Sequence, residues 1–288
     1  MENTARLLIS CPDRPGIVSA VTGFIFSHNA NINDLDQHST DPEGGQLFMR
    51  VEFQTPYLNV TREAFENAFQ KVVADRYEMN WRIAYATEKQ RLAILVSKQE
   101  HCLFELLWRW SRGELNCDVS MVVSNHPDLR ESVEGFGVPF HHLPVTQETR
   151  AETESRMSEL LDGQADCLIL ARYMQILSGE FVSRWENDII NIHHSFLPAF
   201  AGADPYRQAY DMGVKLIGAT AHYVTAELDA GPIIEQDTAR VNHRYSIEEL
   251  KRVGRDLERH VLARAVRYRL EDRIIVDGAK TVIFRKMV

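Results

Sequence analysis

The apolar pattern of this chain changes character near residue 90, and this change constrains the fold more than any other feature. Before it, strand-like segments such as residues 47–53 alternate apolar and polar positions, as in strands with one face in water. After it, residues 92–96 are apolar at every position, as in a strand buried on both faces. We therefore expect two domains, residues 1–86 and 87–288, joined by the polar stretch at residues 86–90.

The first domain has the pattern of two helices on a four-stranded sheet. Strands are expected at residues 5–11, 31–39, 47–53 and 81–85, with helices at 17–26 and after Thr61. Turn residues separate these segments at 12–16 and at Pro42, Gly44 and Gly45. Thr61 can cap the second helix, whose apolar face is expected to hold Phe65, Ala68, Phe69 and Val72. The order βαββαβ is the split-βαβ, ferredoxin-like pattern.

The second domain alternates strands with helices, which favours a Rossmann-like, mostly parallel α/β sheet. Strands are expected at residues 92–96, 119–123, 138–142, 167–170, 189–193, 222–224 and 233–236. Helices are expected at residues 102–110, 128–134, 148–161 and 247–270.

Charge and composition exclude several classes of protein. The chain has 32 Lys and Arg against 41 Asp and Glu, a net charge of -9, with no dense basic block, so we expect no nucleic-acid partner. No apolar run reaches the ~18 residues of a membrane helix, and no signal-peptide pattern is visible, which predicts a cytoplasmic protein with no membrane partner. The four cysteines form no C-x-x-C pair and are expected to be reduced thiols.

The densest polar cluster follows the apolar residues Ile189 and Ile190 and runs from Asn191 to Ser195. Ligands of open α/β sheets bind at the carboxyl ends of strands, so this cluster is a candidate site. Asn191 and His193 are two residues apart and therefore lie on the same face of a strand, which pairs an amide donor with a titratable imidazole.

A second cluster lies at residues 220–232 and includes His222 and the turn that carries Asp229. The residues alone allow three interpretations. The histidines and the aspartate can be structural turn and capping groups. They can bind a metal through His193, His194, His222 and Asp229, although adjacent strand residues point to opposite faces and no H-x-x-x-H helix is present. Finally, Asn, His and Asp can perform acid–base and oxyanion chemistry on a carbonyl group.

The order of these residues resembles the formyltetrahydrofolate-dependent formyltransferase family. The shared motif comprises Asn191, His193, His194, Ser195, Leu197, Pro198, Gly202, Gly218, Thr220, His222, Val224, Asp229, Gly231 and Ile233. The resemblance implies that Asn191, His193 and Asp229 are catalytic, with His222, Thr220 and Gly231 in support. It also implies a folate pocket lined by Met174, Gln175, Ile176 and Leu177. We expect no bound metal and no cofactor, with the folate as the substrate.

These roles are chemically consistent with one another. In a formyl transfer the carbonyl oxygen becomes an oxyanion, to which Asn191 and protonated His193 can donate hydrogen bonds. Asp229 can order a water, raise the basicity of His193 and accept a proton. His194 and Ser195 are expected to shape the loop, since no sequence feature assigns a base to a Ser195 nucleophile.

The formyl acceptor can be an amine or water. By resemblance, the glycinamide ribonucleotide transferases hold the phosphate of their acceptor in a glycine-rich loop after the first strand. The matching residues 96–102 contain no glycine, and Glu100 would repel a phosphate, which favours water as the acceptor. Lys98 favours an anionic acceptor instead, since its positive charge could bind a phosphate. Residues 13–18 and 31–32 resemble parts of an ACT domain. The arrangement of an ACT domain followed by a formyltransferase-like domain resembles that of the formyltetrahydrofolate deformylase family.

That resemblance implies hydrolysis of 10-formyltetrahydrofolate to formate and tetrahydrofolate, which supplies formate for purine synthesis or balances one-carbon pools. A formyltransferase with an amine acceptor and a non-catalytic folate sensor stay open as alternatives. The ACT resemblance implies a homo-oligomer, dimer or tetramer, and an amino-acid effector that contacts Asp13, Arg14, Gly16 and Asn31.

Overall fold

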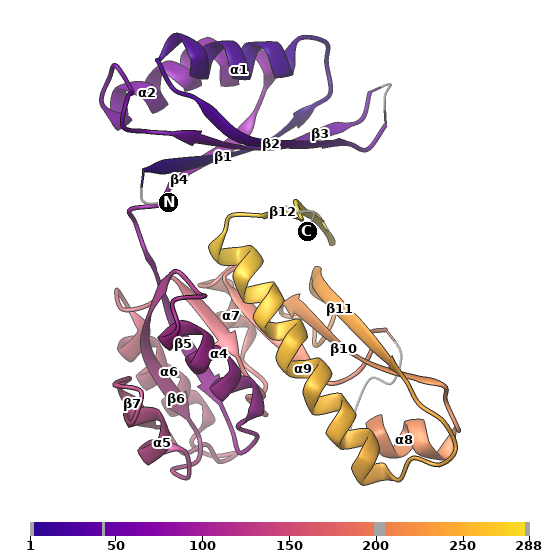
Figure 1. Cartoon of the computed structure of the whole chain (residues 1–288). Coiled ribbons are helices and arrows are strands. Elements are labelled where there is room, and N and C mark those ends of the chain that lie inside the picture. Colours follow the sequence, from indigo (N-terminus) through magenta and orange to yellow (C-terminus); the bar gives the residue numbers. More distant parts are fainter. Residues whose placement is uncertain (1–2, 42–43, 199–204, 286–288) are drawn as a thin grey trace. The chain divides into compact units, whose positions relative to one another are not determined.

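The computed structural model describes residues 3–41, 44–198 and 205–285 (Figure 1). Pro42 of the expected turn and Gly202 of the motif lie outside these ranges. Two compact units make up the chain. The first contains the described parts of Met1–Lys89, Glu271–Asp277 and Val282–Val288, and the second contains Gln90–Leu270 and Gly278–Thr281. We predicted from the sequence that every residue after 86 belongs to the second domain. In the structure, two C-terminal segments group with the first unit.

The first unit has the expected βαββαβ order. Its elements are β1 (Thr4–Pro12), α1 (Ile17–Ser27), β2 (Ile32–Ser39), β3 (Gln46–Gln54), α2 (Arg62–Phe69), η1 (Gln70–Ala74), α3 (Asp75–Tyr77) and β4 (Asn80–Tyr85). The strands form an antiparallel sheet in the order β2-β3-β1-β4, and α1 and α2 lie over one face of it (Figure 1). Thr61 caps α2 by accepting a hydrogen bond from the Ala64 amide, as predicted.

The prediction for Val72 was wrong, because this side chain is 63% exposed. Phe65 and Phe69 are buried, but the stripe continues at Val73 and Tyr77. Residues 70–74 form a π-helical turn, which is wider than an α-helical turn. The extra residue in this turn moves the buried face one position along the sequence.

The other face of this sheet carries a buried arginine, Arg50, that binds the C-terminal segment. Its Nε and Nη2 atoms donate to the carbonyl oxygens of Asp272 and Glu271 at 3.0 and 3.1 Å. Arg50 also forms ion pairs with Glu52 and Asp34 at 2.9 and 3.1 Å. Because Arg50 is only 1% exposed, residues 271–272 complete the burial of a charged side chain on the sheet.

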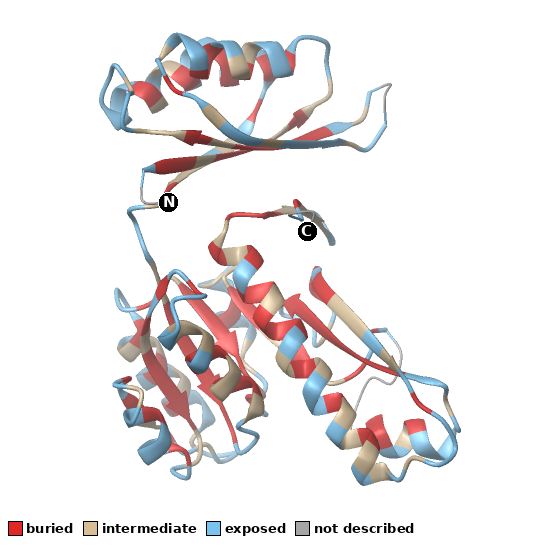
Figure 2. Cartoon of the chain, viewed as in Figure 1, coloured by how far each residue is buried: buried red, intermediate tan, exposed pale blue. Residues whose placement is uncertain are grey.

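The second unit is built on a seven-stranded sheet in the order β11-β10-β9-β8-β5-β6-β7. Strands β5 (Gln90–Val96), β6 (Cys117–Ser124), β7 (Phe140–His142), β8 (Cys167–Leu170) and β9 (Ile189–His193) are parallel. Strands β10 (Leu216–Tyr223) and β11 (Ile233–Arg240) are antiparallel additions at one edge. The structure confirms the mostly parallel sheet. Figure 2 shows that its central strands are almost entirely buried, in accord with their apolar sequences.

The helices of the second unit are α4 (His101–Ser111), α5 (Arg130–Glu134), α6 (Arg150–Leu161), α7 (Gly179–Ser183), α8 (Pro205–Asp211) and α9 (Ile247–Leu270). Helix α9 packs along β10 and β11 and also contacts α4 and α8 (Figure 1). After it, β12 (Ile274–Asp277) and β13 (Lys280–Ile283) form a two-stranded sheet. Among the described residues, none of the helices is both long and apolar enough to cross a membrane. All four cysteines are buried, and none of them forms a disulfide within the described residues.

Candidate active site

Asn191 and His193 lie at the carboxyl end of β9, beside strand β10. In the antiparallel pairing of these strands, Asn191 is opposite His222 and His193 is opposite Thr220. Residues at alternate positions of a strand share a face, so the pairing brings predicted site residues from both strands together. Four of the six predicted catalytic and supporting residues are therefore placed by the sheet itself.

Asp229 reaches the same place from the loop between β10 and β11. Its Oδ2 atom lies 3.2 Å from His193 Nδ1, and its Oδ1 atom lies 3.7 Å from His222 Nε2. The backbone of Asp229 has φ 55°, in the left-handed region that Asp tolerates better than most residues. The hydrogen bond from His193 holds the pKa of Asp229 well below its usual range, although burial opposes this shift. Asp229 is therefore a carboxylate at neutral pH.

His222 orients the amide of Asn191. The Nδ1 atom of His222 lies 2.8 Å from the carbonyl oxygen of Tyr223, and since a carbonyl only accepts, we assign the ring hydrogen to Nδ1. In the neutral ring Nε2 is then an acceptor, and it receives a hydrogen bond from Asn191 Nδ2 at 3.2 Å. The second hydrogen of Asn191 Nδ2 is left for another acceptor.

Thr220 fixes the loop that follows His193. Its buried hydroxyl donates to the carbonyl oxygen of Ser195 at 2.9 Å and accepts from the Leu197 amide at 3.1 Å. Gln236 on β11, which the sequence analysis did not name, donates to the Thr220 hydroxyl at 3.0 Å and to the Leu197 carbonyl at 3.1 Å. Ser195 thus belongs to a loop held by β10 and β11.

Gly231 allows the Asp229 turn to close against the end of β10. A Cβ atom at this position would lie 1.8 Å from the carbonyl oxygen of Tyr223, which no side chain can tolerate. The Tyr223 amide donates to the Pro232 carbonyl at 2.9 Å, so the backbone is held at this close approach. The predicted supporting role of Gly231 therefore has a steric basis.

The Nε2 atom of His193 is the ring nitrogen that this arrangement leaves unengaged. The atom is buried and has no hydrogen-bond partner among the described residues, whereas Nδ1 faces Asp229. A carboxylate, an imidazole with one unengaged nitrogen and an oriented amide are the groups needed to stabilise an oxyanion and to move a proton.

His194 is held in a different environment from His193. Its ring centroid lies 5.2 Å from that of His193 and 6.1 Å from that of Tyr206. Burial, aided by the positive charge of Arg172, lowers the pKa of His194 to about 4. His194 is therefore neutral at physiological pH.

Sequence reasoning missed a buried ionic cluster beside these histidines. It consists of Arg172 after β8, Glu258 on α9, His101 at the start of α4 and Tyr206 on α8. One signal was available, since Glu258 lies in the apolar stripe Leu250, Gly254, Leu262 of α9, where a carboxylate needs a buried partner. The Cys102 thiol lies near His101 and Glu258 at a spacing that metal ligands also show. The Glu258 oxygens are, however, already hydrogen-bonded within the cluster.

The segment predicted to line the folate pocket follows β8 directly. The Met174 amide donates to the Ser97 hydroxyl at 3.0 Å, which joins this segment to the loop after β5. Met174 and Ile176 are 56% and 58% exposed, so they are not core residues, whereas Gln175 is partly buried and Leu177 packs against the core. Two apolar side chains are therefore available to a ligand at the carboxyl edge of the sheet.

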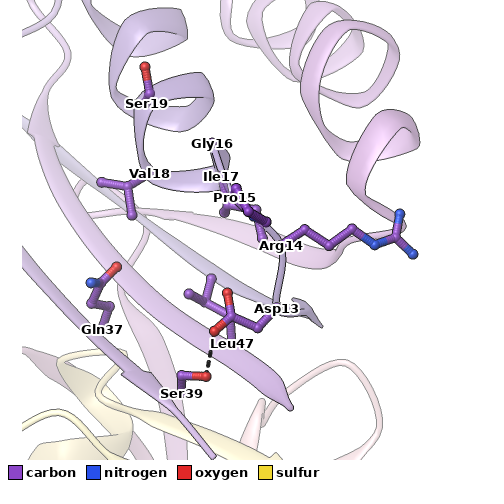
Figure 3. Close-up of a pocket in the computed structure, with 10 residues that line it drawn as sticks. All are labelled: Asp13, Arg14, Pro15, Gly16, Ile17, Val18, Ser19, Gln37, Ser39 and Leu47. Atoms are coloured by element: carbon purple, nitrogen blue, oxygen red, sulfur yellow. Dashed lines mark hydrogen bonds between the residues drawn. The ribbon is translucent and has the colours of Figure 1, made fainter. Parts of the chain in front are cut away.

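The first unit contains a cavity of about 470 Å³ at the start of α1 (Figure 3). Asp13, Arg14 and Gly16 line it, and Gln37 and Ser39 of β2 lie across from them. The Ser39 hydroxyl donates to Asp13 at 2.6 Å. Of the four predicted effector contacts, Asn31 is the one that does not line this cavity.

Comparison with known proteins identifies both units. Residues 90–266 match the formyl transferase family, and residues 5–68 match the ACT domain family. The chain is 53% identical to a formyltetrahydrofolate deformylase of Bacillus subtilis over 98% of this chain and 94% of the relative. It is 42% identical to that of Escherichia coli over 95% of both chains. This chain belongs to the formyltetrahydrofolate deformylase family.

Solved structures agree with membership of the deformylase family. A formyltetrahydrofolate deformylase from Pseudomonas syringae superposes with a TM-score of 0.95 at 49% identity, over 99% of this chain and 95% of that one. A glycinamide ribonucleotide transformylase from Symbiobacterium toebii superposes with a TM-score of 0.65 at 31% identity, over 68% of this chain and 95% of that one. The deformylases thus match the whole chain, whereas this transformylase matches about two thirds of it.

Proposed function

We propose that this chain hydrolyses 10-formyltetrahydrofolate to formate and tetrahydrofolate through Asn191, His193 and Asp229. The observation that carries the proposal is the contact of His193 Nδ1 with Asp229, which leaves His193 Nε2 buried and without a partner among the described residues. The names of the relatives that match along the whole chain support the same reaction.

The proposed reaction begins with attack of water on the formyl carbon. Asp229 Oδ1, at 3.7 Å from His222, keeps lone pairs that can orient this water. The low pKa of Asp229 makes it a weak base, so its main contribution is to order the water and to stabilise the positive charge on His193. The carbonyl oxygen becomes an oxyanion that accepts hydrogen bonds from Asn191 Nδ2 and His193 Nε2.

The tetrahedral intermediate then collapses with cleavage of the bond between the formyl carbon and N10. The N10 atom receives a proton from His193 or solvent, and the attacking water returns one proton to that donor. The formic acid group that forms loses its remaining acidic proton to solvent at neutral pH. The products are tetrahydrofolate and formate. Met174 and Ile176 are proposed to contact the folate through their exposed apolar side chains, with Gln175 and Leu177 beside them.

Formate release in amine-free buffer that contains a chelator tests this function. We expect catalytic release by the wild-type chain with consumption of an equal amount of 10-formyltetrahydrofolate. Absence of release, with formyl transfer when an amine is added, would assign the chain to the transferases. Tight folate binding with neither reaction would instead support a sensor.

The cavity of the first unit is proposed to bind a small amino acid. The carboxylate of the amino acid would accept hydrogen bonds from backbone amides at the start of α1, and the ammonium group of the amino acid would face Asp13. Calorimetric titration of the twenty amino acids against the wild type and Asp13→Asn tests this binding. We also propose a cytoplasmic homo-oligomer, for which solution mass and cell fractionation are the direct measurements.

A further inference from the structure

Three side chains from separate elements meet around the carboxylate of Glu258, which lies on a fourth element. His101 Nε2 lies 2.8 Å from Glu258 Oε2, and the Tyr206 hydroxyl donates to Oε1 at 2.7 Å. Arg172 Nε lies 3.4 Å from Oε2. Helices α4, α8 and α9 and the end of β8 are thus joined through one buried carboxylate.

This cluster is charged although it is buried. The Glu258 side chain is only 2% exposed, yet His101 and Arg172 outweigh the effect of burial and keep the pKa of Glu258 below its usual value. Arg172 Nε and Nη1 are buried and have no hydrogen-bond partner within residues 3–41, 44–198 and 205–285. Arg172 also has φ 64°, a left-handed backbone that arginine adopts rarely.

Stability alone does not explain such an arrangement. Apolar side chains of similar volume are often as stable as a buried ion pair, and unpaired buried donors are unfavourable. Strained or incompletely paired groups of this kind are concentrated at functional sites. A role in the reaction accounts for the cluster better than a role in folding.

The position of the cluster suggests that role. On one side, Tyr206 adjoins His194, which adjoins the catalytic His193. On the other side, His101 lines a cavity of about 810 Å³ together with Lys98, Gln99, Arg255 and Arg259. The chain of contacts from this cavity to His193 therefore passes through Glu258 and its partners.

We propose that Arg172 and Glu258 determine the formyl acceptor, because their ion pair separates molecules in this cavity from the formyl group and leaves water as the acceptor. The inference rests on the hydrolytic function proposed above. Gly254 of α9 contributes by admitting Tyr206 to the cluster, since a Cβ atom there would lie 1.9 Å from the Tyr206 hydroxyl.

The double variant Arg172→Gly, Glu258→Gln removes the ion pair without leaving a lone buried charge on either partner. Hydroxylamine is a suitable probe because it is small and uncharged at neutral pH. Its nitrogen would attack the formyl carbon, the bond to N10 would break, and N10 would gain the proton that hydroxylamine loses. We expect the ratio of formohydroxamate to formate, corrected for the uncatalysed reaction, to rise at least about tenfold over the wild type.

Matched variants separate this effect from changes in backbone strain. Asn187→Gly relaxes another left-handed residue of the same unit, with φ 59°, and is expected to keep the wild-type product ratio. If the double variant fails to fold, Arg172→Asn carries the test, because asparagine tolerates this backbone conformation.

An unchanged product ratio in a folded variant that still consumes substrate would overturn the proposal. Failure of both Arg172 variants to fold would also overturn it, by showing that the cluster serves stability. Absence of formate from the wild type in amine-free buffer would instead refute the hydrolytic function, which keeps the two failures distinct.

Discussion

His193 Nδ1 lies 3.2 Å from Asp229 Oδ2, and this contact joins the end of β9 to the loop that follows β10. In the proposed mechanism, the contact determines which nitrogen of His193 serves the substrate. It also holds Asp229 as a carboxylate, so that one pair of residues supplies both the negative charge and the proton-bearing ring.

Asp229→Asn is expected to lower kcat for formate release by roughly 100- to 10,000-fold, because a neutral amide cannot stabilise the positive charge on His193 as the carboxylate does. Tetrahydrofolate binding should change little. Asp237→Asn on β11 is the control, since Asp237 pairs with Arg264 and not with the site histidines. Near-normal turnover by Asp229→Asn would remove Asp229 from the mechanism.

Asn191→Ala is expected to lower kcat by about 100- to 1,000-fold with little change in KM, as for the loss of one oxyanion donor. The effect falls on kcat because the oxyanion exists only in the transition state and the intermediate. Steady-state kinetics measure this division. A rise in KM at constant kcat would show that Asn191 binds the ground state.

Acid should destabilise the native protein through His194. Its pKa is about 4 in the native state, against an ordinary value of 6.5, so the unfolded chain binds this proton first as the pH falls. The contribution of neutral His194 to the free energy of unfolding is fully present above pH ~6.5 and is lost progressively towards pH ~4, with an upper limit of about 3 kcal/mol. Asp229 affects the free energy of unfolding in a separate and more acidic pH range, because its pKa is lowered from the ordinary value of 3.8.

Urea unfolding from pH 7 to pH 4.5 measures this dependence. His194→Gln should give a flatter profile of the free energy of unfolding than the wild type. Equal slopes for the two proteins would show that His194 titrates normally in the native state.

Gly231→Ala is expected to destabilise the second unit by about 1–3 kcal/mol, the usual range for overpacking, because its Cβ atom would overlap the Tyr223 carbonyl. Thermal unfolding tests this value. Gly179→Ala in the same unit is the control, since a Cβ atom there would lie 3.8 Å from Ala226 Cβ, which is an ordinary contact. Equal stability of both variants would contradict the steric role of Gly231.

Much of the fold was predictable because its segments have strong periodic patterns. The βαββαβ order and helix 247–270 follow from apolar spacing, and Asn191 and His193 follow from their place at a strand end. Val72 was placed wrongly because a π turn changes the period within the helix. The strand at 222–224 was predicted too short, since β10 begins at Leu216 and the residues from Gly218 to Thr220 have no large apolar side chain to mark a strand.

The ionic cluster was harder to predict because its members are distant in sequence. Arg172 and Glu258 are 86 positions apart, and their pairing depends on how α9 packs beside the sheet. A local pattern can mark Glu258 as unusual in an apolar stripe, but it cannot name a partner on another element. The contact between Arg50 and Asp272 was unpredictable for the same reason, since these residues are more than 200 positions apart in the sequence.

The contact between Arg50 and the carbonyl oxygens of residues 271–272 has a consequence for how this architecture is inherited. The first unit draws residues from both ends of the chain, so no single cut or recombination point separates it intact. A fragment that ends near residue 89 would lose the carbonyl partners of a buried arginine. Exchange of this module between proteins therefore requires the C-terminal segment to move with it, or Arg50 to be replaced.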